Sequence, residues 1–199
     1  MKSKGIFGGT FDPIHIAHMY IASEALRQLC LDEVIFVPNG NPPHKKEGKV
    51  TEPKVRYELT KIAIKDYNRF SISDYEIFKK GYSYSYETLQ HFKSIDNSKL
   101  YFIVGADSLM EIYSWKNIEC ILKDCTLVVF NRPSYNKEDI LVQKSKVERE
   151  FQIEILWLDL LNLDISSSYI RDRIREGINI EYFLPYEVYD CIKTMGLYK

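Results

Sequence analysis

The stretch Gly5-Ile6-Phe7-Gly8-Gly9-Thr10-Phe11-Asp12-Pro13-Ile14-His15-Ile16-Ala17-His18 decides the expected fold of this chain. It begins with a short apolar run, which predicts a strand, and the run ends in a glycine pair. Asp12-Pro13 then turns the chain toward a helix that begins near His15. A strand that leads through a glycine turn into a helix is typical of the βαβ unit of a parallel sheet.

Strand-like and helix-like segments alternate along the rest of the chain. Apolar runs rich in β-branched and aromatic residues predict strands at residues 5–8, 33–38, 70–74, 100–105, 126–131 and 153–158. Helical spacing predicts helices at residues 17–29, 55–67, 86–93, 140–151 and 186–195. The strand runs are nearly continuous, which favours strands covered on both faces. We therefore expect one α/β domain over residues 1–199, a doubly wound, Rossmann-like parallel sheet with helices on both faces.

Composition narrows the class of partner. The 199 residues carry 27 Lys plus Arg against 28 Asp plus Glu, a formal net charge of −1. This balance gives no broad basic surface for nucleic acid, so we expect small-molecule partners bound at a local site. No run of about 18 apolar residues predicts a membrane span. Oligomeric state stays open.

The four cysteines point to a reducing compartment. They form no CxxC pair and no Cys/His cluster, so neither a zinc site nor a disulfide framework is expected. Free cysteines commonly behave as small buried hydrophobes in cytoplasmic proteins. The expected localisation is therefore the cytoplasm.

The glycine turn and the helix after it suit a phosphate group. Gly8 and Gly9 allow close approach of a ligand to the backbone, and the helix start offers free N–H groups and the positive end of its dipole. His15 and His18 are three residues apart, so they share one face of the first turn. An isolated pair at this spacing is more often one core and one exposed histidine, but directly after a strand and a glycine pair we expect both to donate to phosphate oxygens.

A second helix start is predicted near residues 166–171. Ser166, Ser167 and Ser168 precede Ile170-Arg171, and serine is a favoured N-cap. Arg171 can fork onto β- or γ-phosphate oxygens if this helix also faces the phosphates. A capped helix with a surface arginine is the alternative.

These segments together resemble the HxGH nucleotidylyltransferase superfamily. Residues 9–18 are similar to its GTFDPxHxGH motif, with Ala17 where the family usually has glycine, and residues 165–171 are similar to its ISSTxIR element, with Ser168 in place of threonine. The form GGTFDPxHxxH resembles the nicotinate-nucleotide adenylyltransferase family in particular. Further matches are the PPHK loop at 42–45, the T-Y-T-x-D-T stretch at 83–88, Gly-Ala-Asp at 105–107 followed by Trp115, and the strand-end Arg-Pro at 132–133.

The resemblance implies a role for each matching residue. His15, His18 and Arg171 are the implied catalytic residues. Residues implied to bind ATP are Gly8, Gly9, Thr10, Phe11, Gly105, Asp107, Arg132, Ser167 and Ser168. Residues implied to bind the nicotinate nucleotide are His44, Lys45, Thr88, Trp115 and Lys116, with Trp115 stacked on the pyridine ring.

The implied reaction joins nicotinate mononucleotide to the AMP part of ATP and releases pyrophosphate, a step of NAD biosynthesis. Mg²⁺ is expected to enter with ATP, held mostly by phosphates and water, and no dedicated metal site is predicted. The alternatives are a pantetheine-phosphate or nicotinamide-mononucleotide adenylyltransferase, a cytidylyltransferase, or a non-catalytic nucleotide-binding module.

Overall fold

A computed structural model describes residues 1–41, 50–131 and 136–199. Its centre is a six-stranded sheet in the order β3-β2-β1-β4-β5-β6, with every neighbouring pair parallel. This is the Rossmann-like α/β fold that the sequence predicts. The strands are β1 (Ser3–Gly9), β2 (Glu33–Pro38), β3 (Phe70–Ile72), β4 (Lys99–Gly105), β5 (Thr126–Phe130) and β6 (Leu156–Leu158).

The long predicted helices are confirmed within a few residues. They are α1 (Ile16–Gln28), α2 (Pro53–Ile64), α4 (Ser85–Ile95), α7 (Lys137–Phe151) and α9 (Tyr186–Met195). Shorter helices stand between them: α3 (Tyr75–Phe78), α5 (Ala106–Met110), η1 (Ile112–Ser114), α6 (Ile118–Asp124), α8 (Ser167–Arg175) and η2 (Glu181–Phe183). Apart from α8, these short helices are not predicted from the sequence, because they span too few residues to show a clear period.

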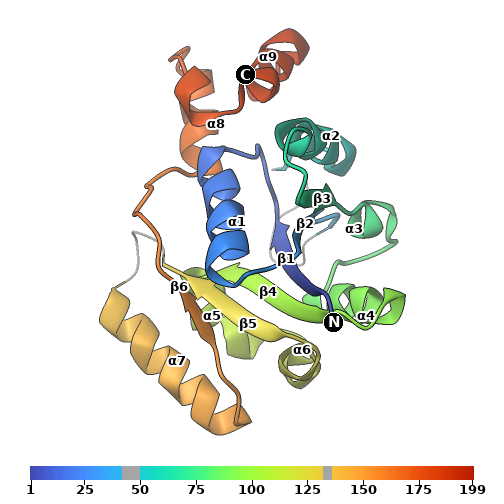
Figure 1. Ribbon diagram of the computed structural model, residues 1–199. Helices are drawn as coiled ribbons and strands as arrows, with labels where there is room; N and C mark the ends of the chain where they lie inside the picture. Colours follow the sequence, from blue (N-terminus) through green and yellow to red (C-terminus); the bar gives the residue numbers. More distant parts are fainter. Residues whose placement is uncertain (42–49, 132–135) are drawn as a thin grey trace.

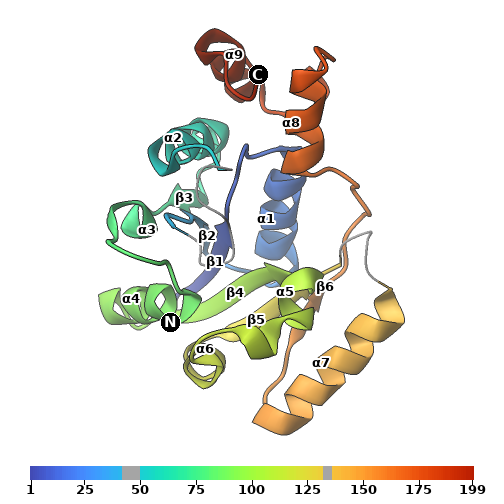
Figure 2. The same ribbon diagram turned by 180° about the vertical axis from the view of Figure 1, so that it is seen from behind.

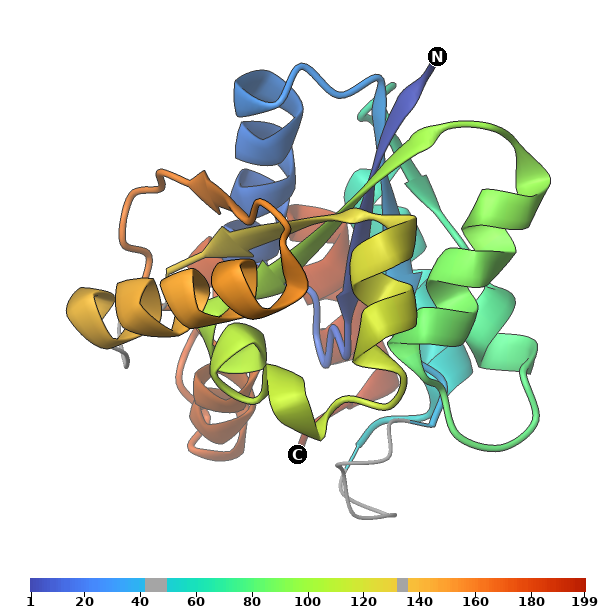
Figure 3. The same cartoon turned by 90° about the horizontal axis from the view of Figure 1, so that it is seen from below.

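Alternation of side chains along each strand divides the core between the two sheet faces. Phe7 of β1, Ile103 of β4 and Val128 of β5 pack with α1, α2, α8 and α9, whereas their neighbours Ile6 and Phe102 pack with α4, α5, α6 and α7. Figure 3 shows α1 (blue) and α7 (orange) on opposite sides of β5 (gold). Helices therefore cover both faces, which explains why the central residues of the strands are apolar on both sides of the sheet.

Strand order reverses between β1 and β4, the two central strands. β1 is followed by β2 on one side of the sheet, whereas β4, β5 and β6 extend the other side. Because the strands are parallel, Gly9 at the end of β1 and Gly105 at the end of β4 lie at the same edge. Figures 1 and 2 both show α8 beside the N-terminal end of α1 at this edge. Such a switch point is where open α/β sheets bind ligands.

The expectation for the cysteines is wrong in one respect. All four are free thiols, but Cys30 is exposed and Cys120, Cys125 and Cys191 are only partly buried. Cys30 lies just after α1 with a φ of 49°, in a connection at the surface. Among the described residues, no helix is long and apolar enough to cross a membrane.

Candidate active site

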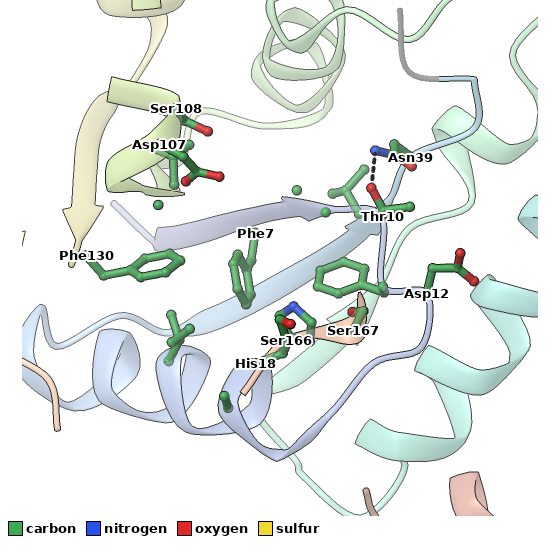
Figure 4. Close-up of a pocket in the computed structure, with 18 of the residues that line it drawn as sticks. Phe7, Thr10, Asp12, His18, Asn39, Asp107, Ser108, Phe130, Ser166 and Ser167 are labelled. Carbon is green, nitrogen blue, oxygen red and sulfur yellow. Dashed lines mark hydrogen bonds between the residues drawn. The ribbon is translucent and has the colours of Figure 1, made fainter. Parts of the chain in front are cut away.

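A cavity of about 660 Å³ opens at the switch point. Figure 4 shows His18, Ser166 and Ser167 on one side and Asp107 and Ser108 on the other. The sequence-predicted residues that line it are Gly8, Gly9, Thr10, Phe11, His15, His18, Gly105, Asp107, Trp115, Lys116, Ser167, Ser168 and Arg171. The fold therefore brings segments from most of the chain's length to one cavity.

The turn after β1 is shaped by Phe11. Its backbone has a φ of 48°, in the left-handed region, and its ring is buried. A Cβ on Gly9 would stand 2.8 Å from that ring, so only glycine fits there without a shift. On Gly8 a Cβ would meet only Phe102, at 3.7 Å. Gly9 thus makes room for Phe11, and Gly8 is the glycine that presents open backbone to the cavity.

His15 and His18 form one unit at the start of α1. His15 is the N-cap residue, and its backbone N–H donates to Nδ1 of His18 over 3.2 Å. The two rings stack with centroids 3.7 Å apart, and Phe11 meets His18 edge-on at 5.0 Å. With Nδ1 accepting, a neutral His18 ring carries its proton on Nε2. The cap and the aromatic neighbours therefore fix both the orientation and the tautomer of His18.

α8 begins against the same turn. Ser166 is its N-cap, and its hydroxyl accepts from the N–H of Tyr169, as the serine-rich sequence predicts. Ser167 donates to the carbonyl of Pro13 over 2.9 Å, and Arg171 donates to the carbonyl of Asp12 over 2.7 Å. Neither α1 nor α8 has an acidic residue in its first turn. Two positive helix ends therefore border the cavity without a side-chain anion of their own.

A buried arginine ties the loops after β1 and β2 together. Arg56 of α2 is 0% exposed and donates to the carbonyls of Thr10, Asn39 and Thr51 over 2.6, 2.7 and 2.8 Å. Asn39 in turn donates to the hydroxyl of Thr10 over 3.3 Å, the bond drawn in Figure 4. Burial lowers the pKa of Arg56, opposed by the nearby carboxylate of Asp12. Arg56 is not among the predicted site residues, because one arginine in an amphipathic helix resembles a surface residue.

The part of the cavity near β4 carries the aromatic and cationic side chains. Asp107 lies in the first turn of α5, after the end of β4. Trp115 follows η1 and packs on Phe102, with ring centroids 5.8 Å apart. Nζ of Lys116 lies 4.4 Å from the ring centre of Tyr84, a residue that also lines the cavity. This cation–π contact joins two segments that the sequence resemblance assigned to the same pyridine ring.

Thr88 is predicted to bind the nicotinate nucleotide, and in the structure its side chain faces another residue. It does not line the cavity, because its buried hydroxyl turns to Glu76 and donates to Oε1 over 2.6 Å. Glu76 lines the cavity instead, and burial raises the pKa of this carboxyl despite the hydrogen bond from Thr88. Gly40 packs against it so closely that a Cβ there would stand 2.0 Å from the Glu76 carbonyl. Thr88 therefore holds Glu76, a residue that lines the cavity, by this hydrogen bond.

Three predicted site residues, His44, Lys45 and Arg132, lie outside the described residues. Asn39, Tyr84, Glu76 and Asn131 line the cavity without having been predicted. Asn39 follows the predicted strand at 33–38 and Asn131 is the last residue of the one at 126–131, so the rule that ligands bind at strand ends could have found both. Among the described residues, no group of three or more His, Cys, Asp or Glu is arranged to hold a metal ion.

A family model described as cytidylyltransferase-like matches residues 6–173 of this chain. The probable nicotinate-nucleotide adenylyltransferase of Clostridium perfringens strain 13 is 54% identical over 200 aligned positions, covering 100% of this chain and 99% of that protein. The probable nicotinate-nucleotide adenylyltransferase of Clostridium tetani is 50% identical and is covered completely. The similarity therefore extends over the whole length of both relatives.

Solved structures have the same fold. The Plasmodium falciparum nicotinic acid mononucleotide adenylyltransferase complexed with NaAD superposes with a TM-score of 0.80 at 23% identity, covering 100% of this chain and 98% of that one. The same enzyme complexed with APC gives a TM-score of 0.77 at 22% identity. At 22–23% identity, these similarities show that the fold is shared and nothing further.

Proposed function

The chain belongs to the cytidylyltransferase-like family and, within it, to the nicotinate-nucleotide adenylyltransferases, and we propose that it joins nicotinate mononucleotide to AMP from ATP. The products are nicotinate adenine dinucleotide and pyrophosphate. The observation that carries the proposal is the pair of helix N-termini, α1 and α8, that border one cavity with His15, His18 and Arg171 beside them. Such a site favours a ligand with several phosphates.

The reaction needs no covalent intermediate. An oxygen of the nicotinate nucleotide's phosphate attacks the α-phosphorus of ATP and forms the new P–O bond. The bond from that phosphorus to the oxygen bridging the β-phosphate breaks, and pyrophosphate leaves with its electron pair. The protein contributes alignment of the two phosphates and stabilisation of the charge that develops on the leaving group.

His18, His15 and Arg171 stabilise the negative charge of different phosphates. His18, held at Nδ1 by the N–H of His15, presents the Nε2 proton to the α- and β-phosphate oxygens. His15 supports that ring by stacking and lines the same cavity. Arg171, whose guanidinium is anchored on the Asp12 carbonyl, meets the outgoing pyrophosphate. Lys45 and His44 hold the phosphate of the attacking nucleotide, as the PPHK resemblance implies.

The pyridine end of the acceptor lies against Trp115, Lys116 and Tyr84. An indole offers a flat face for the ring, and the ammonium of Lys116 provides positive charge near a ring carboxylate. This arrangement supports the acid rather than the amide form of the nucleotide.

Mg²⁺ accompanies ATP as part of the substrate. Several carboxylates line the cavity, Asp107 among them, but in the part of the chain that the structure describes they form no group of three that could hold a metal ion, so phosphate oxygens and water supply most of the ligands. The free thiols of the four cysteines support a reducing compartment, the cytoplasm.

The proposed function is tested with purified protein, ATP and Mg²⁺ and a panel of acceptors: nicotinate mononucleotide, nicotinamide mononucleotide and phosphopantetheine. We expect pyrophosphate release with a kcat/KM for the nicotinate form about 100-fold or more above that for the amide. CTP in place of ATP serves as the control for the nucleotide donor. A faster reaction with the amide or with phosphopantetheine would overturn the substrate assignment.

A further inference from the structure

Asp12 joins three distant parts of the chain. Its side chain is almost fully buried, and Oδ2 accepts from the backbone N–H of Thr51 over 3.3 Å. Oδ1 accepts from the hydroxyl of Tyr198 over 3.0 Å. Nη1 of Arg171 lies 3.9 Å from Oδ2 while it donates to the Asp12 carbonyl. In Figure 4 the Asp12 carboxylate points away from His18, so these contacts are made behind the turn that borders the cavity.

Tyr198 reaches Asp12 from the segment after α9. Gly196 ends that helix in the left-handed region with a φ of 63°, and Tyr198 itself has a φ of 67°. This conformation is unfavourable for a residue with a side chain, so the rest of the structure must hold it there. Burial, and secondly the charge of Asp12, raise the pKa of the Tyr198 hydroxyl. The hydroxyl therefore stays protonated at neutral pH and acts as a donor.

Tyr198 does not line the cavity, so it affects the site through the residues that it contacts, and its hydroxyl does so through Asp12. The Asp12 carbonyl holds Arg171 and the adjoining Pro13 carbonyl holds Ser167. The same short turn leads to His15, the cap of α1. A shift of Asp12 would therefore move both groups that border the phosphates, the start of α1 and the start of α8.

We infer that Tyr198 is a positioning residue for adenylyl transfer: its hydroxyl fixes Asp12 and, through Asp12, the relative placement of Arg171 and the histidine pair. This inference rests on the proposed function. Loss of the hydroxyl leaves a buried carboxylate with one donor fewer, and Asp12 can turn toward Arg171 to replace it. That movement would draw the guanidinium away from the leaving phosphates.

The test is Tyr198→Phe, which keeps the ring and removes only the hydroxyl. Assayed well below its own melting temperature, it should show kcat lowered by about 10- to 100-fold. KM for nicotinate mononucleotide should change by less than about threefold, because Trp115 and Lys116 lie on other elements. Tyr186→Phe removes the hydroxyl of an exposed tyrosine on α9 and should match the native protein. A lower melting temperature with native kcat would show a structural role only and overturn the inference.

A double-mutant cycle with Asp12→Ala, which removes the acceptor of the Tyr198 hydroxyl, tests the route through Asp12. If Tyr198 acts through that carboxylate, Tyr198→Phe should have little further effect on kcat once Asp12 is Ala. Independent, multiplicative losses would overturn the inference. Failure of the proposed function looks different, because the native protein would then release no pyrophosphate with nicotinate mononucleotide at all.

Discussion

The backbone N–H of His15 donates to Nδ1 of His18 over 3.2 Å, and the two rings stack 3.7 Å apart. One histidine thus orients the other through the backbone of the helix cap. The spacing of three residues that the sequence displays is the spacing this contact requires.

His18→Ala should lower kcat by about 100- to 1,000-fold, because it removes the donor that faces the developing charge. The fold should remain, since His18 is only partly buried and the cap backbone of α1 is unchanged. The measurements are pyrophosphate release and thermal unfolding. His91→Ala is the matched control, because His91 stacks on Tyr75 away from the cavity. A kcat of native size for His18→Ala would remove this residue from the mechanism.

Arg56→Lys should lower the free energy of unfolding by about 2–4 kcal/mol. A lysine keeps the charge but cannot reach the carbonyls of Thr10, Asn39 and Thr51 together, so buried acceptors lose their donors. Urea unfolding measures the change. Arg69→Lys, an exposed arginine that donates to the Asp32 carbonyl, should cost no more than about 0.5 kcal/mol. Equal losses in the free energy of unfolding for the two variants would show that the buried hydrogen bonds of Arg56 contribute no more to stability than those of an exposed arginine.

Glu76→Gln should raise the melting temperature at about pH 8, and the gain should shrink as the pH falls toward about 4. Burial raises the pKa of Glu76, so the folded protein binds this proton more tightly than the unfolded chain. The native protein therefore loses stability as the pH rises from the unfolded pKa through the folded one. Glutamine keeps an acceptor for Thr88 and has no charge to desolvate.

The control for this pH series is Glu58→Gln, which removes one charge from an exposed position on α2. It should give a small shift that does not change over the same pH range. The pH dependence assigned to Glu76 is contradicted if its substitution also shifts the melting temperature by a constant amount.

Gly9→Ala should cost about 1–3 kcal/mol of stability, because the new methyl group meets the buried ring of Phe11. Gly8→Ala is the neighbouring control: its methyl group would make only an ordinary contact with Phe102 and should cost less. Chemical unfolding of both variants measures the two losses of stability. A larger loss at Gly8 than at Gly9 would show that the turn is not shaped by Phe11.

The sequence predicts the fold well because its strong signals are local. Residues 34–38 of β2 are apolar without interruption, since the parallel sheet is covered on both faces, and α9 begins and ends at the predicted residues. The short helices α3, α5 and α6 were not predicted, because fewer than eight residues cannot display a helical period.

The candidate site is predictable where it follows strand ends and helix caps, as His15, His18 and Ser167 do. Arg56 and Tyr198 could not be recognised, because their partners lie 46 and 186 residues away in the chain and only the folded structure brings them together. The direction of the Thr88 hydroxyl could not be predicted, because it depends on Glu76, which packs against α4 from another element.

In the proposed reaction, AMP moves from ATP to the phosphate of nicotinate mononucleotide in the cavity between α1 and α8. The most direct measurement follows ATP labelled at the α-phosphate and, in a parallel reaction, ATP labelled at the γ-phosphate. We predict that the α-label appears in nicotinate adenine dinucleotide and the γ-label in pyrophosphate, and that His18→Ala slows both equally. Transfer of the γ-label to the acceptor, or no labelled dinucleotide with the native protein, would contradict this reaction.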